Sequence, residues 1–368
     1  MKICLVHRNN GSDPRLMKIS ASLVKAGHYV GFIGWDIRFE QCLPCTLCAH
    51  ESYVLKRRTP HGWSGISHLA PFLRHVYSVL AKFRPDAVHC VNEEMALLVL
   101  PWRRILFRWL ICDLFDSMKD RGQLPGRPVF NFAVRIASDV ALRFSDRLIA
   151  TDERRWQRLG SFRNKAIVIA NVPVDPGVEL SKQLPEGEVK VFLSGSLCES
   201  RGLDIVISAV EKVEEACLIA AGWCTDDATA ERLSNHPLVR WVGHISSHDA
   251  LRLAAQCDAV FAYYKPDRIN NIYASPNKVF DAMSVGRPVI INSETKISSW
   301  VVSNGLGFAA PYEDVDVLAG IIEGLKQHRT RLPEFAARAR SIYEHEFTWE
   351  IMERRLLKLY DELAEKQC

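Results

Sequence analysis

Short apolar segments alternate with helical segments along the whole of this chain. The opening KICLVH and the later VKVFLSG, ACLIAAG, VRWVGHI, AVFAYY and RPVIINS have the character of buried strands, whereas residues 14–27 carry apolar side chains at the period of a helix. The other strands expected in the first half are residues 29–35, 86–91, 105–113 and 147–150. This alternation predicts an α/β fold, in which parallel strands are joined by crossover helices.

The chain is also long enough for two domains. A single core rarely serves 368 residues, and a Pro- and Gly-rich stretch, NVPVDPGVELSKQLPEGE, separates two series of strands. We predict a first domain at 1–172, a linker at 173–187, a second domain at 188–346 and a C-terminal helix at 347–368. Doubly wound sheets bind ligands at the carboxyl ends of their strands, so we expect two such domains facing a central cleft.

The bulk composition favours a cytoplasmic globular protein. Hydrophobic residues make up 48% and charged residues 24% of the chain, and no run reaches the roughly 18 to 20 apolar residues of a membrane-spanning helix. The apolar run at the start is too short for a secretory signal. Eleven cysteines, an odd number spread mainly through apolar segments, favour reduced thiols over a disulfide framework.

Charge is distributed unevenly between the two halves. Residues 1–165 hold 26 Lys and Arg against 14 Asp and Glu, a net +12, and the remainder holds 21 against 29, a net −8. A basic half suits a phosphate-bearing substrate or an anionic membrane surface, or it is a solvated surface with no partner. Nucleic acid is disfavoured as a partner, because the second half is acidic and carries no recognition motif.

Two basic segments, PWRRILFRW and KRRTPHGW, combine Arg with Trp. This combination suits an anionic bilayer interface or the surface of an oligosaccharide. It also fits an ordinary surface helix with a buried Trp stripe.

Residues 275–281, SPNKVFD, have the pattern of a helix start. Ser275 is expected as the N-cap and Pro276 as the first helical residue, ahead of a periodic apolar run. The free N–H groups of such a start, at Asn277 and beyond, suit a phosphate, and Lys278 adds a positive charge there. Asp281 lies on the same face, where it can accept hydrogen bonds from a ribose diol. The pattern alone also fits a purely structural helix start.

The longer segment ASPNKVFDAMSVGRPVI resembles the donor-binding segment of glycosyltransferase family 4, a group of retaining enzymes with the GT-B fold. The family phrase Leu-Glu-Ala-Met-Ala-x-Gly-x-Pro-Val is matched here by FDAMSVGRPVI. The resemblance places Asp281 at the second of the family's two glutamates, which contacts the nucleotide ribose. The first glutamate's position falls on Tyr273, which departs from the family pattern, although some similar members also carry Pro-Asn-Lys.

The resemblance extends over nearly the whole chain and includes a phosphate loop. FLSGSLCESRGLDIVISAV resembles the loop that opens the family's second domain, where Ser196 and Arg201 match its polar residues. Beside Gly202, at a strand-to-helix turn, the Arg201 guanidinium can hold a diphosphate leaving group bidentately, or it is an ordinary exposed arginine. FTWEIMERRLLKLYDEL resembles the family's last helix, which crosses back to the first domain.

Two loops of the first half are further candidates. Asn10 and Gly11 follow the first strand in a polar turn, where backbone amides can approach a phosphate or a sugar. Neither this turn nor FLSG carries Gly-x-Gly-x-x-Gly, which argues against a dinucleotide oxidoreductase. In ICDLFDSM we assign Asp116 to the acceptor, where the family often has Asp or His, with a helix N-cap as the alternative. Asp113 is expected to make a structural hydrogen bond.

No metal or cofactor is expected. Cys42, Cys45 and Cys48 have Cys-x-x-Cys spacing, but His50 and His61 do not complete a familiar zinc pattern. GT-B enzymes generally stabilise the leaving diphosphate with basic residues and helix N-termini, which this chain offers.

Together these features predict a metal-independent, retaining hexosyltransferase. Arg201, Lys278 and the helix amides would bind the diphosphate of a nucleotide sugar, with UDP favoured, while Asp281 binds the ribose and Asp116 the acceptor. The expected acceptor is a glycan or a lipid-linked molecule of cell-surface polysaccharide synthesis, used in the cytoplasm or at the inner face of the cell membrane. Two alternatives stay open: a sugar-nucleotide epimerase of the same shape, and a non-catalytic nucleotide-sugar or glycan binder, which Tyr273 in place of an acid favours.

Overall fold

The computed structural model describes residues 1–36, 47–56, 69–121, 126–178, 187–327 and 329–366. Its contacts divide the chain into two compact units. Unit 1 combines Met1–Ala170 with Met352–Cys368, and unit 2 is Asn171–Ile351. Residues 179–186 of the predicted linker lie outside the described residues. The domain limits expected from the sequence, at 172, 187 and 346, stay predictions.

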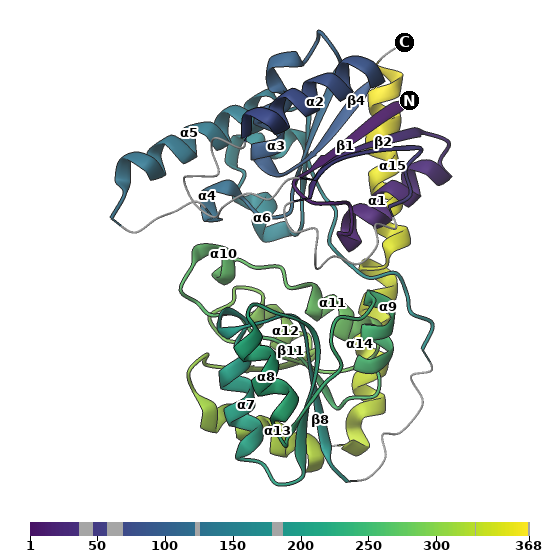
Figure 1. Ribbon diagram of the computed structural model, residues 1–368. Helices are drawn as coiled ribbons and strands as arrows, with labels where there is room; N and C mark the ends of the chain where they lie inside the picture. Colours follow the sequence, from purple (N-terminus) through teal and green to yellow (C-terminus); the bar gives the residue numbers. More distant parts are fainter. Residues whose placement is uncertain (37–46, 57–68, 122–125, 179–186, 328, 367–368) are drawn as a thin grey trace. The chain divides into compact units, whose positions relative to one another are not determined.

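Unit 1 contains a seven-stranded parallel sheet with helices packed on it (Figure 1). The strand order is β3-β2-β1-β4-β5-β6-β7, so the direction of chain progression reverses between β1 and β4. The strands are β1 Lys2–His7, β2 Tyr29–Asp36, β3 Glu51–Lys56, β4 Ala87–Val91, β5 Trp109–Leu114, β6 Arg147–Ala150 and β7 Ala166–Val168. The helices are α1 Pro14–Lys25, α2 Leu69–Phe83, α3 Asn92–Val99, η2 Leu100–Trp102, α4 Met118–Arg121, α5 Pro128–Phe144, α6 Glu153–Gln157 and η3 Gly160–Lys165.

Unit 2 contains a six-stranded parallel sheet of the same kind. Its order is β10-β9-β8-β11-β12-β13, with the reversal between β8 and β11. The strands are β8 Val189–Leu197, β9 Ala216–Cys224, β10 Val239–Trp241, β11 Ala259–Ala262, β12 Val289–Asn292 and β13 Gly307–Ala310. The helices are η4 Glu199–Arg201, α7 Leu203–Glu211, α8 Asp227–Asn235, α9 Ser247–Ala254, α10 Ile269–Ile272, α11 Asn277–Ser284, α12 Ser298–Ser303, α13 Val315–Gln327, η5 Arg329–Arg331 and α14 Leu332–Glu346.

The last helix, α15 (Trp349–Glu365), belongs mainly to unit 1. From Met352 onward its residues are grouped with that unit, and Leu356, Tyr360 and Leu363 are buried. The Tyr360 hydroxyl lies 2.8 Å from Nδ1 of His89, on β4. The C-terminal helix therefore returns to the first unit, as the sequence predicted.

Burial on both faces of each sheet explains the continuous apolar strands. Residues 3–6 of β1 and 289–291 of β12 have no exposed surface, as is typical of strands in a parallel sheet covered by helices. The predicted class, two doubly wound α/β sheets, is confirmed. Among the described residues, no helix combines the length and the hydropathy that crossing a bilayer requires.

The sequence pattern was least reliable at the sheet edges. The three strands that it did not predict, β3, β7 and β13, all lie at an edge, where their side chains are mostly half-buried and the apolar signal is weak. The strand expected at 105–113 begins only at Trp109. Residues 103–107 form a turn in which Arg104 has a φ of +69° and Ile105 is exposed, so this apolar run overstated the strand.

Gly222→Ala should destabilise unit 2. Gly222, at φ +139°, pairs with Gly195 across β8 and β9, and a Cβ at Gly222 would lie 1.8 Å from the Gly195 carbonyl oxygen. We expect a loss of about 3 kcal/mol or more, because a clash adds to the backbone strain. Gly187→Ala is the matched control: its φ is +113°, no described atom lies within 4 Å of the new Cβ, and strain alone of about 1–2 kcal/mol applies. Equal losses in urea unfolding would contradict the steric account.

Candidate functional site

The strand reversal of unit 2 places two loops next to one another. β8 and β11 are neighbours in the sheet, but the strands that follow each of them are added in opposite directions. Ligands of open α/β sheets bind at the carboxyl ends of such a strand pair. The loop after β8 contains η4, and the loop after β11 begins with Tyr263 and Tyr264. The Lys265 N–H donates to the Ser200 carbonyl at 3.1 Å, which ties the two loops together.

Gly202 allows the loop after β8 to turn tightly into α7. Its φ is +70°, and a Cβ there would lie 2.9 Å from Cδ1 of Tyr263. A side chain at this position would therefore meet both backbone strain and a buried ring. The turn directs Arg201 over the ring of Tyr264, with the guanidinium carbon 4.3 Å from the ring centroid. Stacking on an aromatic face holds the cation in place while its N–H groups stay available for hydrogen bonds.

The loops after β11, β12 and β13 form a hydrogen-bonded rim around this point. Asn292 Oδ1, at the end of β12, accepts from the Tyr264 N–H at 2.9 Å, and Asn292 Nδ2 donates to Glu294 at 3.0 Å. Glu294 in turn accepts from the Tyr312 N–H at 3.1 Å, after β13. The Tyr312 hydroxyl donates to the Glu199 carbonyl at 2.9 Å, so the rim closes on the loop after β8. A closed ring of bonds gives the edge a fixed geometry.

Helix α11 brings the second cation to the same edge. Lys278 Nζ lies 2.7 Å from Asp281 Oδ2, and each side chain is about one-fifth exposed. Burial disfavours the charge on Lys278, but the Asp281 carboxylate outweighs it and raises the pKa of the ammonium group above its usual value. The Tyr264 hydroxyl acts in the same direction. Lys278 therefore lies within electrostatic range of Tyr264, the ring on which Arg201 stacks, although Arg201 and Lys278 are 77 positions apart in the chain.

The start of α11 differs by one residue from the sequence prediction. Pro276, expected as the first helical residue, is the N-cap with extended angles (φ −64°, ψ 121°), and the helix begins at the exposed Asn277. Ser275, expected as the N-cap, makes no capping bond; its Oγ is buried and has no hydrogen-bond partner among the described residues. Because proline fixes φ but lacks a side-chain acceptor, it marks this helix end without satisfying the N–H groups that follow.

Ser196, the other residue predicted in the phosphate loop, lies near the end of β8. Its Oγ is 3.5 Å from Cys198 Sγ, which lies 3.1 Å from Ser200 Oγ. These three side chains form a short polar row along the loop that leads to Arg201. Ser196 is half-buried.

The candidates of the first half lie at the corresponding edge of unit 1. Asn10 Oδ1 accepts from Ser12 N–H at 3.1 Å and from Ser12 Oγ at 2.7 Å, so this side chain is engaged in shaping the turn. Gly11 has a φ of +92° and is buried. The structure brings these two residues together after β1.

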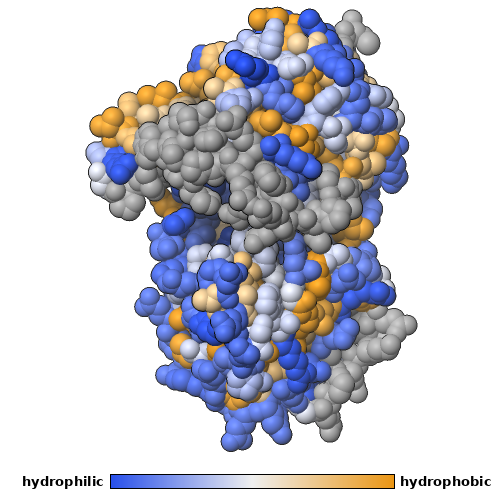
Figure 2. Space-filling model, viewed as in Figure 1, coloured by the Kyte–Doolittle hydropathy of each residue, from blue (hydrophilic) through white to orange (hydrophobic). Residues whose placement is uncertain are grey.

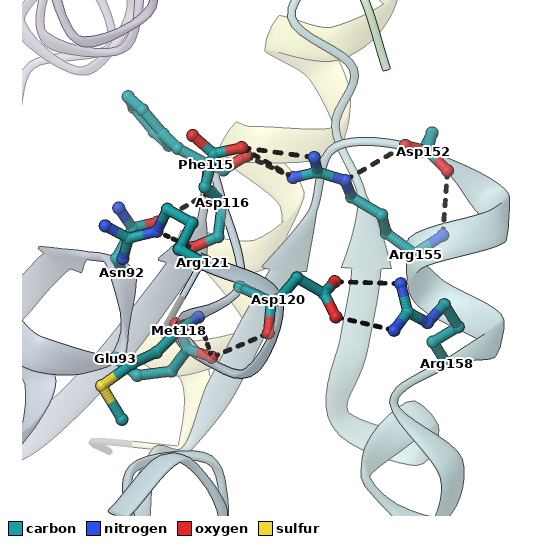
Figure 3. A network of polar contacts seen from close by, with 11 residues as sticks. Asn92, Glu93, Phe115, Asp116, Met118, Asp120, Arg121, Asp152, Arg155 and Arg158 are labelled. Atoms are coloured by element: carbon teal, nitrogen blue, oxygen red, sulfur yellow. Dashed lines mark hydrogen bonds and ion pairs between the residues drawn. The ribbon is translucent and has the colours of Figure 1, made fainter. Parts of the chain in front are cut away.

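Asp116 follows β5 at the same edge of unit 1 (Figure 3). Its Oδ1 pairs with Arg155 Nη2 at 3.2 Å, and Arg155 also donates to the Phe115 carbonyl at 2.5 Å. The Asp116 N–H donates to Asn92 Oδ1 at 3.0 Å, which fixes the backbone. Asp116 remains 44% exposed, enough for contact with a second molecule.

Glu93, and not Asp116, caps the next helix, α4. The first N–H of α4, on Met118, donates to the Glu93 carboxylate at 3.0 Å (Figure 3). Glu93 is buried and also accepts from Ser138 Oγ at 3.0 Å. Burial raises the pKa of Glu93. Asp116 is thereby left as the exposed carboxylate of this loop.

Asp113 makes the structural bonds expected for it. It is fully buried, with its two oxygens 2.9 and 3.1 Å from Nη2 and Nε of Arg15. His89 Nε2 lies 3.4 Å from the same carboxylate, and the other nitrogen of that ring meets Tyr360 of α15. Burial favours the neutral acid, but the Arg15 charge outweighs it and holds the pKa of Asp113 below its usual range.

The cysteine segment contributes no metal site within the described residues. Cys42 and Cys45 lie outside them, and Cys48 is exposed. In the described part of the chain, no three His, Cys, Asp or Glu side chains are grouped so that they could hold a metal ion.

The sequence of unit 2 matches a known protein family at this site. Residues 188–328, which include the loop after β8, Tyr264 and α11, match the family model described as "Glycosyl transferases group 1". This stretch of unit 2 is therefore similar to that family. The match includes Arg201, Lys278 and Asp281, but it does not extend to unit 1 or to α15.

A curated relative is similar over a longer stretch of the chain. WcaL of Escherichia coli (strain K12), named as a colanic acid biosynthesis glycosyltransferase, is 23% identical over 224 residues. The match covers 57% of this chain and 54% of the relative, so the chain spans about half the length of the curated protein that it matches.

Solved structures are similar in fold over nearly the full length of this chain. Sucrose-phosphate synthase from Thermosynechococcus elongatus is similar over 100% of both chains, with a TM-score of 0.76 and 15% identity. HepE from Anabaena, in complex with UDP, is similar over 98% of this chain and 100% of its own, with a TM-score of 0.71 and 18% identity. HepE is also known in complex with UDP-glucose. At these identities the likeness concerns the fold, and the GT-B fold predicted from the sequence is confirmed.

Sequence reasoning missed Tyr264 and the rim that holds it. Tyr264 follows AVFA, a strand that was correctly predicted, and polar or aromatic residues at the carboxyl end of a strand next to a reversal are the signal that could have found it. The strand order that identifies the reversal is a property of the folded sheet. Asn292, Glu294 and Tyr312 could be found only through it.

Proposed function

We propose that this chain is a retaining glycosyltransferase that moves a hexose from a UDP-sugar to a glycan or a lipid-linked acceptor. The observation that supports it most is a pair of cations: Arg201, stacked on Tyr264, and Lys278, at the start of α11, lie at the edge of the unit 2 sheet where α/β sheets bind nucleotides. The HepE complexes with UDP and UDP-glucose favour uridine over other bases. The name of WcaL favours cell-surface polysaccharide synthesis.

Transfer requires a diphosphate to leave. As the bond between the sugar's anomeric carbon and the β-phosphate oxygen breaks, negative charge accumulates on the diphosphate. Arg201 supplies two parallel N–H donors, Lys278 supplies a point charge kept protonated by Asp281, and the N–H groups of Asn277 and Lys278 add the positive end of α11. Fixed charges of this kind favour the transition state without a bound metal.

The remaining candidates take roles around this core. Asp281 uses the oxygen that is not paired with Lys278 to accept from the ribose diol. Ser196, Ser275 and Pro276 line the approach to the diphosphate; the buried Ser275 Oγ without a partner suits a phosphate oxygen. In unit 1, Asp116 orients the acceptor hydroxyl, and Asn10 and Gly11 approach the sugar. The retention that the family resemblance implies needs no protein nucleophile.

Turnover of UDP-sugars tests the proposal. The purified chain should be stabilised against heat by UDP-sugars more than by GDP-sugars, and it should release UDP only when a lipid-linked or free glycan acceptor is present. Chelation of divalent cations should leave the rate unchanged. Conversion of the UDP-sugar without an acceptor would indicate an epimerase instead, and stabilisation without any turnover would indicate a binding protein. The proposal would be contradicted if no nucleotide sugar stabilised the protein and none was turned over.

A further inference from the structure

Helix α5 of unit 1 presents an apolar stripe to solvent. Val129, Phe132, Ile136 and Phe144 are 82%, 65%, 49% and 44% exposed. The first three are three and four positions apart, a spacing that places them on one face of the helix. Ser138, Ala141 and Leu142 are buried on the opposite face. The helix thus has an apolar side toward solvent in addition to its packed side.

The stripe lies where α5 projects beyond the sheet of unit 1. Figure 1 shows the N-terminal half of α5 extending outward from the unit, and Figure 2, in the same view, shows hydrophobic atoms gathered at that end. A single exposed apolar residue is ordinary, whereas a contiguous row along one helix face marks a surface that binds something.

The charges beside the stripe are mainly positive. Arg127, Arg135 and Arg143 are exposed, and the carboxylate of the same segment, Asp139, pairs with Lys119 Nζ at 2.6 Å. A helix of this length, about 25 Å, with an apolar face bordered by arginines is typical of helices that lie in the interface of an anionic membrane. A second copy of the chain is a poorer occupant, because pairing two such faces would bring their arginines together.

We propose that α5 docks unit 1 on an anionic lipid surface. Val129, Phe132 and Ile136 enter the boundary between headgroups and acyl chains, and Arg127, Arg135 and Arg143 meet lipid phosphates. The inference is independent of the proposed transfer reaction, because it rests on α5 alone and its readout needs neither donor nor acceptor.

The location differs from the one that the sequence indicated. Residues 57–63 of KRRTPHGW lie outside the described residues. In PWRRILFRW, Arg103 pairs with Asp146, Arg108 stacks 4.9 Å from the centroid of the Trp109 ring, and Phe107 is buried. That segment uses much of its Arg and aromatic content within unit 1, whereas the apolar stripe of α5 faces outward.

Flotation of the full chain with vesicles tests the proposal. Vesicles of phosphatidylcholine with about 30% phosphatidylglycerol should bind the protein, pure phosphatidylcholine should bind it weakly, and raising NaCl from about 50 to about 500 mM should reduce binding. The triple variant Val129→Ser, Phe132→Ser, Ile136→Ser should bind the vesicles about tenfold or more weakly, because each substitution removes the apolar contacts of that side chain with the acyl chains. Arg127→Gln, Arg135→Gln, Arg143→Gln together should weaken binding and flatten its salt dependence.

Two controls make the outcome specific. Ile105→Ser, in PWRRILFRW, removes a side chain that is 70% exposed in the same unit and should leave binding unchanged. Because every substituted side chain is exposed, all variants should melt at the wild-type temperature. The proposal is overturned if the α5 triple variant binds as wild type, if Ile105→Ser removes binding instead, if neutral vesicles bind equally, or if the α5 substitutions dissolve a dimer without changing vesicle binding.

Discussion

Lys278→Ala should lower acceptor-dependent release of UDP by about 10²–10³-fold, the usual loss when one fixed group that stabilises a developing anion is removed. The ammonium group is held in place by Asp281 at 2.7 Å, and its raised pKa keeps it charged throughout the neutral range. Because this charge matters most when the diphosphate leaves, kcat should fall more than the affinity for UDP. Steady-state kinetics together with calorimetric binding of UDP would separate the two effects.

Two further variants sharpen this prediction. Arg201→Ala should reduce the rate to a similar degree, and Arg201→Lys should restore only part of it, since a lysine cannot provide the bidentate grip. Lys212→Ala is the matched control: Lys212 is exposed and pairs with Asp316, and it follows the C-terminal end of α7, at the edge of the sheet away from Tyr264. A Lys278→Ala enzyme that works within about threefold of wild type would show that the diphosphate binds elsewhere.

Asp113→Ala should be the most destabilising of the polar substitutions considered for unit 1. It leaves the Arg15 guanidinium buried without its carboxylate, a change that costs about 3–5 kcal/mol. Hydrogen exchange of β1 and β5 amides would report the loss within unit 1, even if the two units unfold separately. Asp139→Ala removes a half-exposed partner from a surface pair and should cost at most about 1 kcal/mol.

The contribution of Asp113 to the free energy of unfolding should change with pH in a defined direction. Because Arg15 depresses the pKa of Asp113 in the folded protein, the stabilisation is fully present above the unfolded value of about 3.9 and is lost as pH falls through the lower folded value. The difference between wild type and Asp113→Ala should therefore be constant near neutral pH and shrink in strong acid. A difference that grows on acidification would show that Asp113 is protonated in the native protein.

The fold followed from the sequence wherever a strand is central. VKVFLSG and ACLIAAG are buried on both faces, so their apolar character alone identified them, whereas Glu51–Lys56 at the sheet edge mixes polar and apolar residues and gave no clear pattern. The distinction is physical: an edge strand is half solvated, and its side chains need not be apolar.

Parts of the site were predictable for a different reason. Lys278 and Asp281 are three positions apart on one helix, so their proximity follows from helical geometry. The approach of Arg201 to Tyr264, and the buried bond between Arg15 and Asp113, join residues 63 and 98 positions apart. Such pairs depend on strand order and loop conformation, which local periodicity does not encode.

Helix α15 also affects the order in which this protein can mature. During synthesis the residues of unit 1 up to Ala170 emerge first, and N-terminal domains usually fold as they appear. Here, however, Leu356, Tyr360 and Leu363 are buried in the unit that is made first, and the hydroxyl of Tyr360 reaches His89, 271 positions earlier. The residues of α15 must therefore be synthesised before unit 1 is complete, and until then the surface that they cover stays open to quality-control factors that recognise exposed apolar side chains.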